Sequence, residues 1–370
     1  MNTWLTWTEN GQTRQARWHQ GNGAAIPKKI VSVDAVGADK ALTLMHAQTA
    51  LLWRGDYHQA KQLLAAIKKR VRGKNRVQND FHRYRMQQAQ QSRLFQLLLL
   101  EVNGEAKLSN PRAPSIADAL RDAGLNLPNE PFLLPLHLLL GYIGAYEWHK
   151  QGIAVAALDQ QTIHVPFGVF SPIRGEYIDL TAQAVLPNPC RTAWDIGTGS
   201  GVLAAVLVRR GVQKIIATDI NPRALAAANA NIERLGLTGQ VAVQAADLFP
   251  VAAAKADLIV CNPPWLPAKP AADIETALYD PQHAMLQAFL NGASGHLTES
   301  GQVWLIMSDL AEHLGLRSPD ALQQWFQAAG LQVIARSSIR PSHPKTQQTD
   351  NPLHAARMQE TTTLWQLTRI

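Results

Sequence analysis

The sequence predicts an α/β protein whose C-terminal part forms a mostly parallel sheet. Three observations lead to this prediction. Beyond residue 189, apolar strand-like runs alternate with helical stretches, a rhythm typical of parallel sheets that helices cover on both faces. Glycines stand where the first of these strands turns into a helix, and an Asn-Pro-Pro-Trp run follows the fourth. Residues 1–150 lack this rhythm and are predicted to form a separate domain that is mainly helical.

Seven strands are expected in residues 151–370. They are Thr192 to Ile196, Lys214 to Thr218, Val241 to Gln244, Ala256 to Cys261, Val303 to Met307, Leu331 to Ala335 and Thr363 to Leu367. Helices are expected from Gly201 to Arg210, from Pro222 to Leu235, and from Ser318-Pro319 to Gly330, where a cap residue, a first-turn proline and a closing glycine mark both ends. A linking hairpin is expected between Ile153 and Asp179, before a helix from about Tyr177.

The N-terminal domain is expected to begin with a small β-hairpin, because Asn10-Gly11 between alternating stretches favours a two-residue turn. From about Ala38 to Leu100 the pattern is predominantly helical. One helix is capped by Asp56, and a second runs from about Asp80 to Glu101. Further helices are expected at Ser115 to Ala123 and Glu130 to Glu147.

The charge of the chain is unevenly spread. Residues 1–150 hold 20 Lys+Arg against 11 Asp+Glu, whereas residues 151–370 hold 15 against 17. A basic module joined to a near-neutral one indicates a polyanionic or acidic partner. Two cysteines, no secretion signal and no apolar run long enough to span a bilayer favour a soluble protein of the reducing cytoplasm, with no metal site expected.

The glycine loop Asp195-Ile196-Gly197-Thr198-Gly199-Ser200-Gly201 predicts a cofactor site. Glycines allow a tight turn and a close approach to a ligand, and the following helix N-terminus offers free N–H groups. A dinucleotide dehydrogenase would need glycines in the pattern G-x-G-x-x-G, but Val202 stands at the sixth position here. A purely structural turn is the alternative that the loop alone leaves open.

Acidic residues end the first three strands of this sheet, at Asp195, Asp219 and Asp247. Ligands of open α/β sheets bind at this edge. Asp219 is expected to accept hydrogen bonds from two ribose hydroxyls, and Asp247 from an adenine amino group beside the apolar Leu248. Asp195 is expected near an ammonium group. Each aspartate taken singly also fits a helix cap or a loop residue.

The run Asn262-Pro263-Pro264-Trp265 predicts a clamp for a planar NH2 group. Prolines fix φ and donate no backbone hydrogen bond, so their carbonyls can face a cleft. The Asn262 side-chain oxygen and the Pro263 carbonyl would then accept both protons of the NH2 group and aim its lone pair at a donor. Trp265 would stack on the planar target. The alternative is a proline-rich turn around a buried tryptophan.

These two motifs resemble those of class I S-adenosylmethionine-dependent methyltransferases of the small-domain type, over about Ile163 to Ile370. The resemblance implies a seven-stranded, mostly parallel Rossmann-like methyltransferase sheet and S-adenosyl-L-methionine as cofactor. It assigns the target nitrogen to Asn262, Pro263, Pro264 and Trp265. The implied cofactor-binding residues are Asp195, Gly197, Thr198, Gly199, Gly201, Asp219, Ile220, Asp247, Leu248 and Asn262. Trp265 departs from the usual Tyr or Phe.

The run Phe170 to Glu176 resembles the segment before the core in release-factor glutamine N5-methyltransferases and in some ribosomal-RNA guanine methyltransferases. Arg174 in this run is therefore a candidate substrate residue. The N-terminal region shares no motif with either group, so the resemblance does not carry over a substrate.

A basic stretch from Lys61 to Arg85 has nine Lys+Arg, one acid and two interleaved aromatics, which favours a phosphate-tracking face. Lys68, Lys69 and Arg70 are its candidate substrate residues, and a solvated helix face is the alternative. A long loop near residues 338–361 holds Arg340, His343, Lys345, His354 and Arg357, whose spacing matches no standard metal site. Its length indicates a functional role. Asp309, Glu312 and His313 fit surface and cap roles better.

The favoured hypothesis is a methyltransferase acting on a base amine in structured RNA, ribosomal or transfer RNA, because the added domain is basic. The runner-up acceptor is a glutamine side-chain amide in a protein. A catalytically silent RNA-binding protein is the third possibility, but a binding module has no need of the clamp.

Overall fold

The computed structural model describes residues 3–19, 21, 24–73, 80–127, 129–251, 254–270, 273–341 and 353–370. The chain divides into two compact units, Met1–Glu147 and Trp148–Ile370, called units 1 and 2 below. Each has its own sheet. Within the described residues, no helix is both long and apolar enough to cross a membrane.

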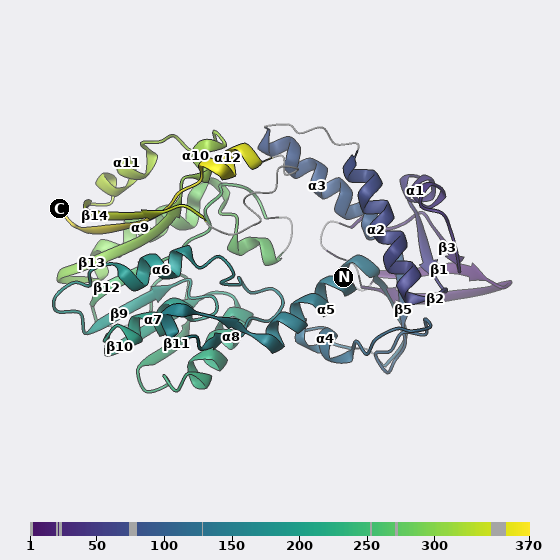
Figure 1. The fold of residues 1–370 in the computed structure, drawn as a ribbon, viewed down its shortest axis with the longest axis horizontal. Coiled ribbons are helices and arrows are strands. Elements are labelled where there is room, and N and C mark those ends of the chain that lie inside the picture. Colours follow the sequence, from purple (N-terminus) through teal and green to yellow (C-terminus); the bar gives the residue numbers. More distant parts are fainter. Residues whose placement is uncertain are drawn as a thin grey trace. The chain divides into compact units, whose positions relative to one another are not determined.

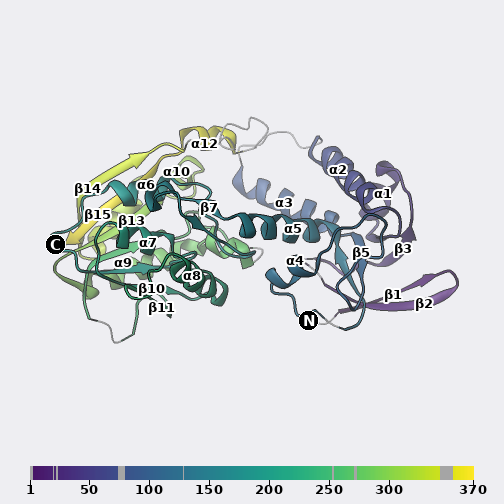
Figure 2. The same ribbon diagram turned by 60° about the horizontal axis from the view of Figure 1, so that its bottom comes forward.

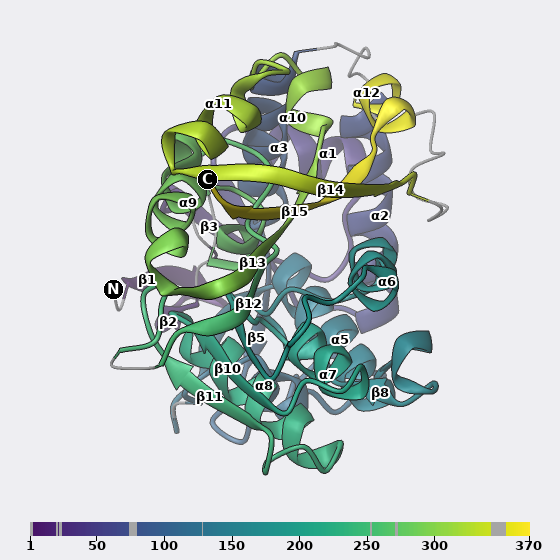
Figure 3. The same ribbon diagram turned by 90° about the vertical axis from the view of Figure 1, so that its left-hand side faces the viewer.

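Unit 2 is built on a seven-stranded sheet in the order β11-β10-β9-β12-β13-β15-β14. Its strands are β9 Thr192–Ile196, β10 Lys214–Asp219, β11 Val241–Ala245, β12 Ala256–Cys261, β13 Leu297–Ser308, β14 Leu331–Ile339 and β15 Thr362–Arg369. The pairs from β11 to β13 are parallel, whereas β15 runs antiparallel to both β13 and β14. Figure 3 shows β14, β15 and β13 side by side. The α/β prediction for this part of the chain is confirmed.

Helices cover both faces of this sheet (Figure 1). They are α6 Glu176–Gln183, α7 Val202–Arg209, α8 Pro222–Arg234, α9 Ala284–His296, α10 Leu310–His313, α11 Ala321–Ala328 and α12 His354–Gln359. One core cluster joins α6, α7 and α8 to the side chains of Leu258 and Val260. The other joins α9 and α11 to Ile259 and Cys261 on the opposite face. Residues 258–261 of the central strand β12 are buried and all apolar, as is typical of a strand that helices cover on both faces.

Short elements complete unit 2. They are the hairpin strands β7 Ile153–Ala154 and β8 Thr162–Ile163, and the 3₁₀ turns η1 Ala156–Leu158, η2 Asp273–Ala277 and η3 Pro281–His283. Helix α8 begins where the sequence requires, because the Asn221 side chain accepts a hydrogen bond from the N–H of Arg223 and Pro222 occupies the first turn.

Unit 1 is built on a six-stranded sheet in the order β1-β2-β6-β5-β4-β3. Its strands are β1 Thr3–Glu9, β2 Gln12–Trp18, β3 Lys29–Val33, β4 Thr49–Trp53, β5 Leu98–Val102 and β6 Phe132–Pro135. β1 and β2 form a hairpin (Figure 2) that turns at Asn10 and Gly11, both with positive φ. The helices are α1 Ala38–His46, α2 Tyr57–Gly73, α3 Phe81–Phe95, α4 Ala117–Asp122 and α5 Leu136–Gln151.

The prediction of a mainly helical N-terminal domain missed this sheet. Thr49–Trp53 lies inside the run predicted as helical, but it forms β4 and pairs in parallel with β3. The leucines after Leu97 form β5 rather than the end of a helix, and Phe132–Pro135 forms β6 ahead of α5. β4 and β6 are buried at every position, so the alternation that reveals a half-exposed strand is absent from them.

Candidate functional site

The glycine loop of unit 2 leaves the carboxyl end of β9 in a conformation that requires glycine. Gly197, Gly199 and Gly201 have φ values of 70°, 56° and 81°, in the left-handed region that side chains disfavour. A Cβ on Gly199 would meet open space, and one on Gly197 would meet only the Met285 Cε at 3.9 Å. These two glycines therefore present bare backbone to an open side of the loop.

Gly201 has a different role, because it packs closely against α8. A Cβ there would lie 3.3 Å from the Cα of Ala228. The buried Asn231 of the same helix donates hydrogen bonds from Nδ2 to the carbonyl of Ser200 at 3.0 Å and to that of His164 at 2.9 Å. The loop is thus held from behind by α8.

Asp195 lies beneath the loop rather than beside the cavity. Its carboxyl is 1% exposed, and its Oδ2 accepts hydrogen bonds from the Thr198 hydroxyl at 2.6 Å and the Ala204 N–H at 3.1 Å. Burial raises the pKa of Asp195 to about 6, although the two hydrogen bonds oppose that rise. Asp195 therefore holds the loop and the start of α7, and its expected place near a ligand ammonium stays a prediction.

Asp219 ends β10 at the open side of the loop. Its Oδ2 accepts a hydrogen bond from the Gly199 N–H at 3.0 Å and its Oδ1 accepts one from the Asn221 N–H at 2.8 Å. Each carboxylate oxygen keeps further lone pairs for a ligand. The exposed Ile220 follows it directly.

Asp247 and Leu248 follow β11. Leu248 has a positive φ of 67°, and its carbonyl accepts a hydrogen bond from the Thr218 hydroxyl at 2.6 Å. The next residue, Phe249, stacks on Phe289 of α9 at 5.9 Å between ring centroids. Strand β10 and helix α9 therefore fix the turn that carries the exposed Asp247.

The Asn-Pro-Pro-Trp run leaves the carboxyl end of β12, which pairs in parallel with β9. Asn262 is half-buried and Pro263 is buried. The Trp265 indole Nε1 donates a hydrogen bond to the Asn262 Oδ1 at 3.0 Å. The chain then returns, since Leu266 bridges to Tyr279 and its carbonyl accepts a hydrogen bond from the Asp280 N–H at 2.9 Å.

One cavity of about 460 Å³ joins the glycine loop to the Asn-Pro-Pro-Trp run. The expected site residues that line it are Arg174, Gly197, Thr198, Gly199, Asp219, Ile220, Asp247, Leu248, Asn262, Pro263, Pro264 and Trp265. Asp195 and Gly201 are not among the residues that line it. The two motifs, 60-odd residues apart in sequence, thus face the same hollow at one edge of the sheet.

Other segments complete the wall of this cavity, and among them the sequence pointed only to the late loop. Tyr177, Tyr279, Met285, Leu310, Arg357 and Glu360 all line it. Glu360 is 1% exposed and accepts hydrogen bonds at Oε1 from the Ser308 hydroxyl at 2.9 Å and from Arg174 at 3.2 Å. The late loop, predicted to be functional from its length, therefore contributes Arg357 and Glu360. His343 and Lys345 lie outside the described residues.

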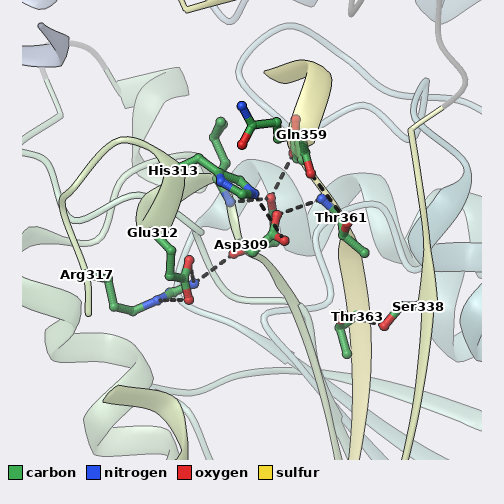
Figure 4. A network of polar contacts seen from close by, with 11 residues as sticks. Asp309, Glu312, His313, Arg317, Ser338, Gln359, Thr361 and Thr363 are labelled. Carbon is green, nitrogen blue, oxygen red and sulfur yellow. Dashed lines mark hydrogen bonds and ion pairs between the residues drawn. The ribbon is translucent and has the colours of Figure 1, made fainter. Parts of the chain in front are cut away.

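A polar network holds this segment against the end of β13 (Figure 4). The Asp309 Oδ1 accepts a hydrogen bond from the Thr361 N–H at 2.6 Å, and its Oδ2 lies 3.4 Å from the His313 Nε2. Arg317 donates to both oxygens of Glu312, at 2.9 and 2.8 Å. Asp309 is the N-cap residue of α10. The Asp309 contact connects Thr361, the residue after Glu360, to the end of β13.

The candidate substrate residues of unit 1 differ from one another in their surroundings. Lys69 is exposed, whereas Arg70 pairs with Asp39 at 2.8 Å. Lys68 is half-buried over the Phe95 ring, with its Nζ 3.2 Å from the His137 Nδ1. Burial, with the charge of Arg72, lowers the pKa of Lys68. Residues 74–79 of the basic stretch lie outside the described residues.

The match to a known protein family lies in unit 2. The family model "Methyltransferase small domain" matches residues 160–337. A release factor glutamine methyltransferase of Cereibacter sphaeroides is 32% identical over 171 residues, which cover 43% of this chain and 58% of that protein. One of Bordetella pertussis is 31% identical over 190 residues, which cover 43% of this chain and 67% of that protein. The chain thus matches between about half and two thirds of the length of these relatives.

Among solved structures, a ribosomal protein L11 methylase from Lactobacillus delbrueckii subsp. bulgaricus is similar to this chain at 21% identity. The match covers 57% of this chain and 86% of that one, with a TM-score of 0.38.

Proposed function

Since the chain belongs to the small-domain family of S-adenosyl-L-methionine-dependent methyltransferases, we propose that it methylates a planar NH2 nitrogen held by Asn262 and Pro263. The observation that carries this proposal is the single cavity lined by both the glycine loop and the Asn-Pro-Pro-Trp run. A fold that only binds a nucleotide-like ligand has no need of two rigid acceptors beside it.

The residues of the glycine loop fit S-adenosyl-L-methionine. Gly197 and Gly199 leave open space above the backbone, and Asp219 offers a carboxylate at the strand end where ribose hydroxyls are bound in α/β sheets. Asp247 and Leu248 offer an acceptor and an apolar contact for adenine. In this proposal, Asp219, Ile220, Asp247 and Leu248 hold the cofactor together with the backbone of residues 197–199. Asp195 and Gly201 act indirectly, by shaping the loop.

The Asn262 and Pro263 oxygens orient the target. The cofactor, when bound, supplies an electrophilic methyl group on a sulfonium. An amide or aryl amine is a poor nucleophile because its lone pair is delocalised. Two fixed acceptors on its two N–H groups draw the nitrogen towards tetrahedral geometry and direct the lone pair, and such positioning lowers the barrier without a general base.

We favour a glutamine side-chain amide in a protein as the acceptor. Two relatives at 32% and 31% identity are named release factor glutamine methyltransferases. A carboxamide presents the two N–H groups that the clamp requires. A cytoplasmic location belongs to the same proposal.

A base amine in structured RNA is the second candidate acceptor. The observation in its favour is the excess of nine positive charges in residues 1–150, with Lys69 exposed on α2. RNA phosphates would bind to such a basic surface. The family model does not reach this part of the chain, since it matches residues 160–337.

Two measurements test the proposal. Titration calorimetry with S-adenosylhomocysteine should show a single site on the wild-type protein; no binding would contradict the enzyme assignment. The protein is then incubated with methyl-labelled cofactor and a lysate from a strain that lacks the protein. This incubation should show which class of macromolecule receives the label. Label in protease-sensitive material supports glutamine, and label in nuclease-sensitive material supports RNA and overturns the favoured acceptor.

A further inference from the structure

The Trp265 side chain makes a contact that a phenylalanine or tyrosine ring at this position would not make. Its indole Nε1 donates to the Asn262 Oδ1 at 3.0 Å. An indole N–H donates and never accepts, so the atom of Asn262 that faces it is the oxygen. The bond therefore fixes which end of the carboxamide is the acceptor, a choice that an isolated amide leaves to its surroundings. A carbonyl oxygen has two lone pairs, and the second stays available for a target N–H.

The indole ring is itself held by a charged side chain. The Arg174 guanidinium lies over the Trp265 ring, 5.6 Å from its centroid. Cation–π contacts of this kind are favourable and strengthen when desolvated. Arg174 has two acidic partners: Glu360 at 3.2 Å and Glu176 at 3.7 Å. Both glutamates are buried, which restricts the positions that the guanidinium can take.

Glu360 is in turn anchored to the sheet. Its Oε1 accepts a hydrogen bond from the Ser308 hydroxyl at 2.9 Å, at the end of β13. The next residue, Thr361, is bonded through its N–H to Asp309. A continuous series of contacts therefore runs from the end of β13 through Glu360 and Arg174 to the Trp265 ring and the Asn262 carboxamide.

We propose that Trp265 is a positioning residue that holds the Asn262 oxygen in place as an acceptor for the target NH2, and that Arg174 and Glu360 set the plane of its ring. This inference rests on the proposed function and deepens it. Because the guanidinium covers one face of the indole, at most one face is left for a planar target. The site would thus accept a flat group from a single side.

The first test is spectroscopic and needs no acceptor. The indole ¹⁵N–¹H signal of Trp265, identified by its loss in Trp265→Phe, should exchange slowly with solvent. Asn262→Ala should shift it and speed its exchange, whereas the Trp365 signal should stay unchanged. A Trp265 signal that is unaffected by Asn262→Ala would overturn the inference.

The second test compares rates of methyl incorporation. Trp265→Phe keeps an aromatic ring but lacks the N–H, and should lower the rate at saturating labelled cofactor by about 10²-fold, the size expected when a reacting group is misplaced by about 1 Å. Its affinity for S-adenosylhomocysteine should change less than about 2-fold. Arg174→Gln should lower the rate by a smaller factor, about 10-fold.

The matched control uses a second arginine–tryptophan pair. Arg336 lies over Trp365 at 5.8 Å, and neither residue lines the cavity. Arg336→Gln and Trp365→Phe should keep the wild-type rate. If the wild type is active and Trp265→Phe is equally active, this inference is wrong but the proposed function stands. If the wild type neither binds S-adenosylhomocysteine nor incorporates label, the proposed function fails and takes this inference with it.

Discussion

Both units contain parallel strands, but the residues at the carboxyl ends of those strands differ in kind. In unit 2 the ends of β9, β10 and β12 carry left-handed glycines, a half-exposed aspartate and a rigid Asn-Pro-Pro run around a cavity. In unit 1 the ends of β3, β4 and β5 carry side chains that satisfy one another. A Cβ on Gly55, just after β4, would lie 2.1 Å from the Asp34 carbonyl, so the backbones are already in contact.

The polar groups of unit 1 at this edge also have partners of opposite charge or matching hydrogen-bond type. Arg54 pairs with Glu9 at 2.7 Å and with Glu101. The buried Asn110 donates hydrogen bonds to the carbonyls of Trp53 and Gly55. Asp195 and Asp219 of unit 2, by contrast, accept hydrogen bonds from neutral N–H and O–H groups. The edge at which parallel strands end can therefore hold a cofactor. It becomes a binding site where the loop backbone is exposed and the acidic residues have no cationic partner.

The largest expected effect tests the open edge of unit 2. Asp219→Ala removes a carboxylate proposed to accept two ribose hydroxyls, and hydrogen bonds to charged groups contribute about 1.5–3 kcal/mol each. Affinity for S-adenosylhomocysteine should fall by about 10²- to 10⁴-fold in calorimetry. Asp56→Ala is the control in unit 1, because Asp56 pairs with Arg112 at 2.7 Å. An equal loss of affinity in both variants would break the comparison.

The second effect is a pH dependence of stability in unit 2. The pKa of Asp195 is raised by burial to about 6, above the value of about 3.9 in an unfolded chain. Between about pH 4 and pH 6 the folded state keeps a proton that the unfolded state has lost. The free energy of unfolding should therefore decrease as pH rises through this window, by about 3 kcal/mol in total.

Asp195→Asn should abolish this slope, because the amide does not titrate and its oxygen can still accept from Thr198. Hydrogen exchange of peptides from β9, followed by mass spectrometry between pH 4.5 and 7.5, measures the opening of unit 2 separately from that of unit 1. Parallel slopes in the wild type and the variant would show that another group is responsible.

A third, smaller effect of opposite sign is expected in unit 1. The hydrogen bond from Arg54 holds the pKa of Glu9 down, at about 2. The stability that this pair contributes is present above about pH 4.5 and is lost as pH falls towards 2. Arg54→Gln should therefore destabilise unit 1 at neutral pH by about 1–2 kcal/mol, since the pair is only partly buried.

Exchange of β4 peptides should detect this loss, and affinity for S-adenosylhomocysteine should stay at the wild-type value. A fall in affinity would mean that the ion cluster of unit 1 does more than hold its own fold together.

The smallest effect concerns the basic surface of unit 1. Lys69→Gln should weaken the binding of a structured RNA fragment without regard to sequence, and should reduce the slope of log K against log salt concentration by about 0.9, the value for one phosphate contact in a duplex. Arg70→Gln is the matched neighbour. Its salt slope should change less, because Arg70 already pairs with Asp39. If neither variant alters the slope, α2 is a solvated face, and the case for RNA as acceptor loses its support.

Local motifs made part of unit 2 predictable. Gly199 and Pro263 belong to runs in which a few adjacent residues fix a backbone shape, and each run follows an apolar strand. Parallel strands bring their carboxyl ends to one edge, so it was possible to place the runs together. The Asn10-Gly11 turn is local in the same way. These features depend on neighbours in sequence, which a single chain displays.

The rest depends on partners distant in sequence. β4 and β6 are short and wholly buried, so their composition does not separate them from a buried helix, and their pairing with β3 and β5 requires residues about 20 to 36 positions away. Glu360 meets Arg174 across 186 residues. The surroundings of Asp195 could not be inferred from its neighbours in sequence, because a strand-end acid can face a ligand or the protein, and its partner Ala204 is in place only once α7 is folded.

The close approach of Gly201 to Ala228, together with the hold of Asn231 on Ser200, has a consequence for engineering this chain. The glycine loop and helix α8 behind it are therefore packed together as one rigid piece. Anyone who wishes to reshape the pocket for a bulkier synthetic methyl-donor analogue should therefore leave positions 201, 228 and 231 intact and change lining residues outside this loop and helix, such as Tyr279 and Met285.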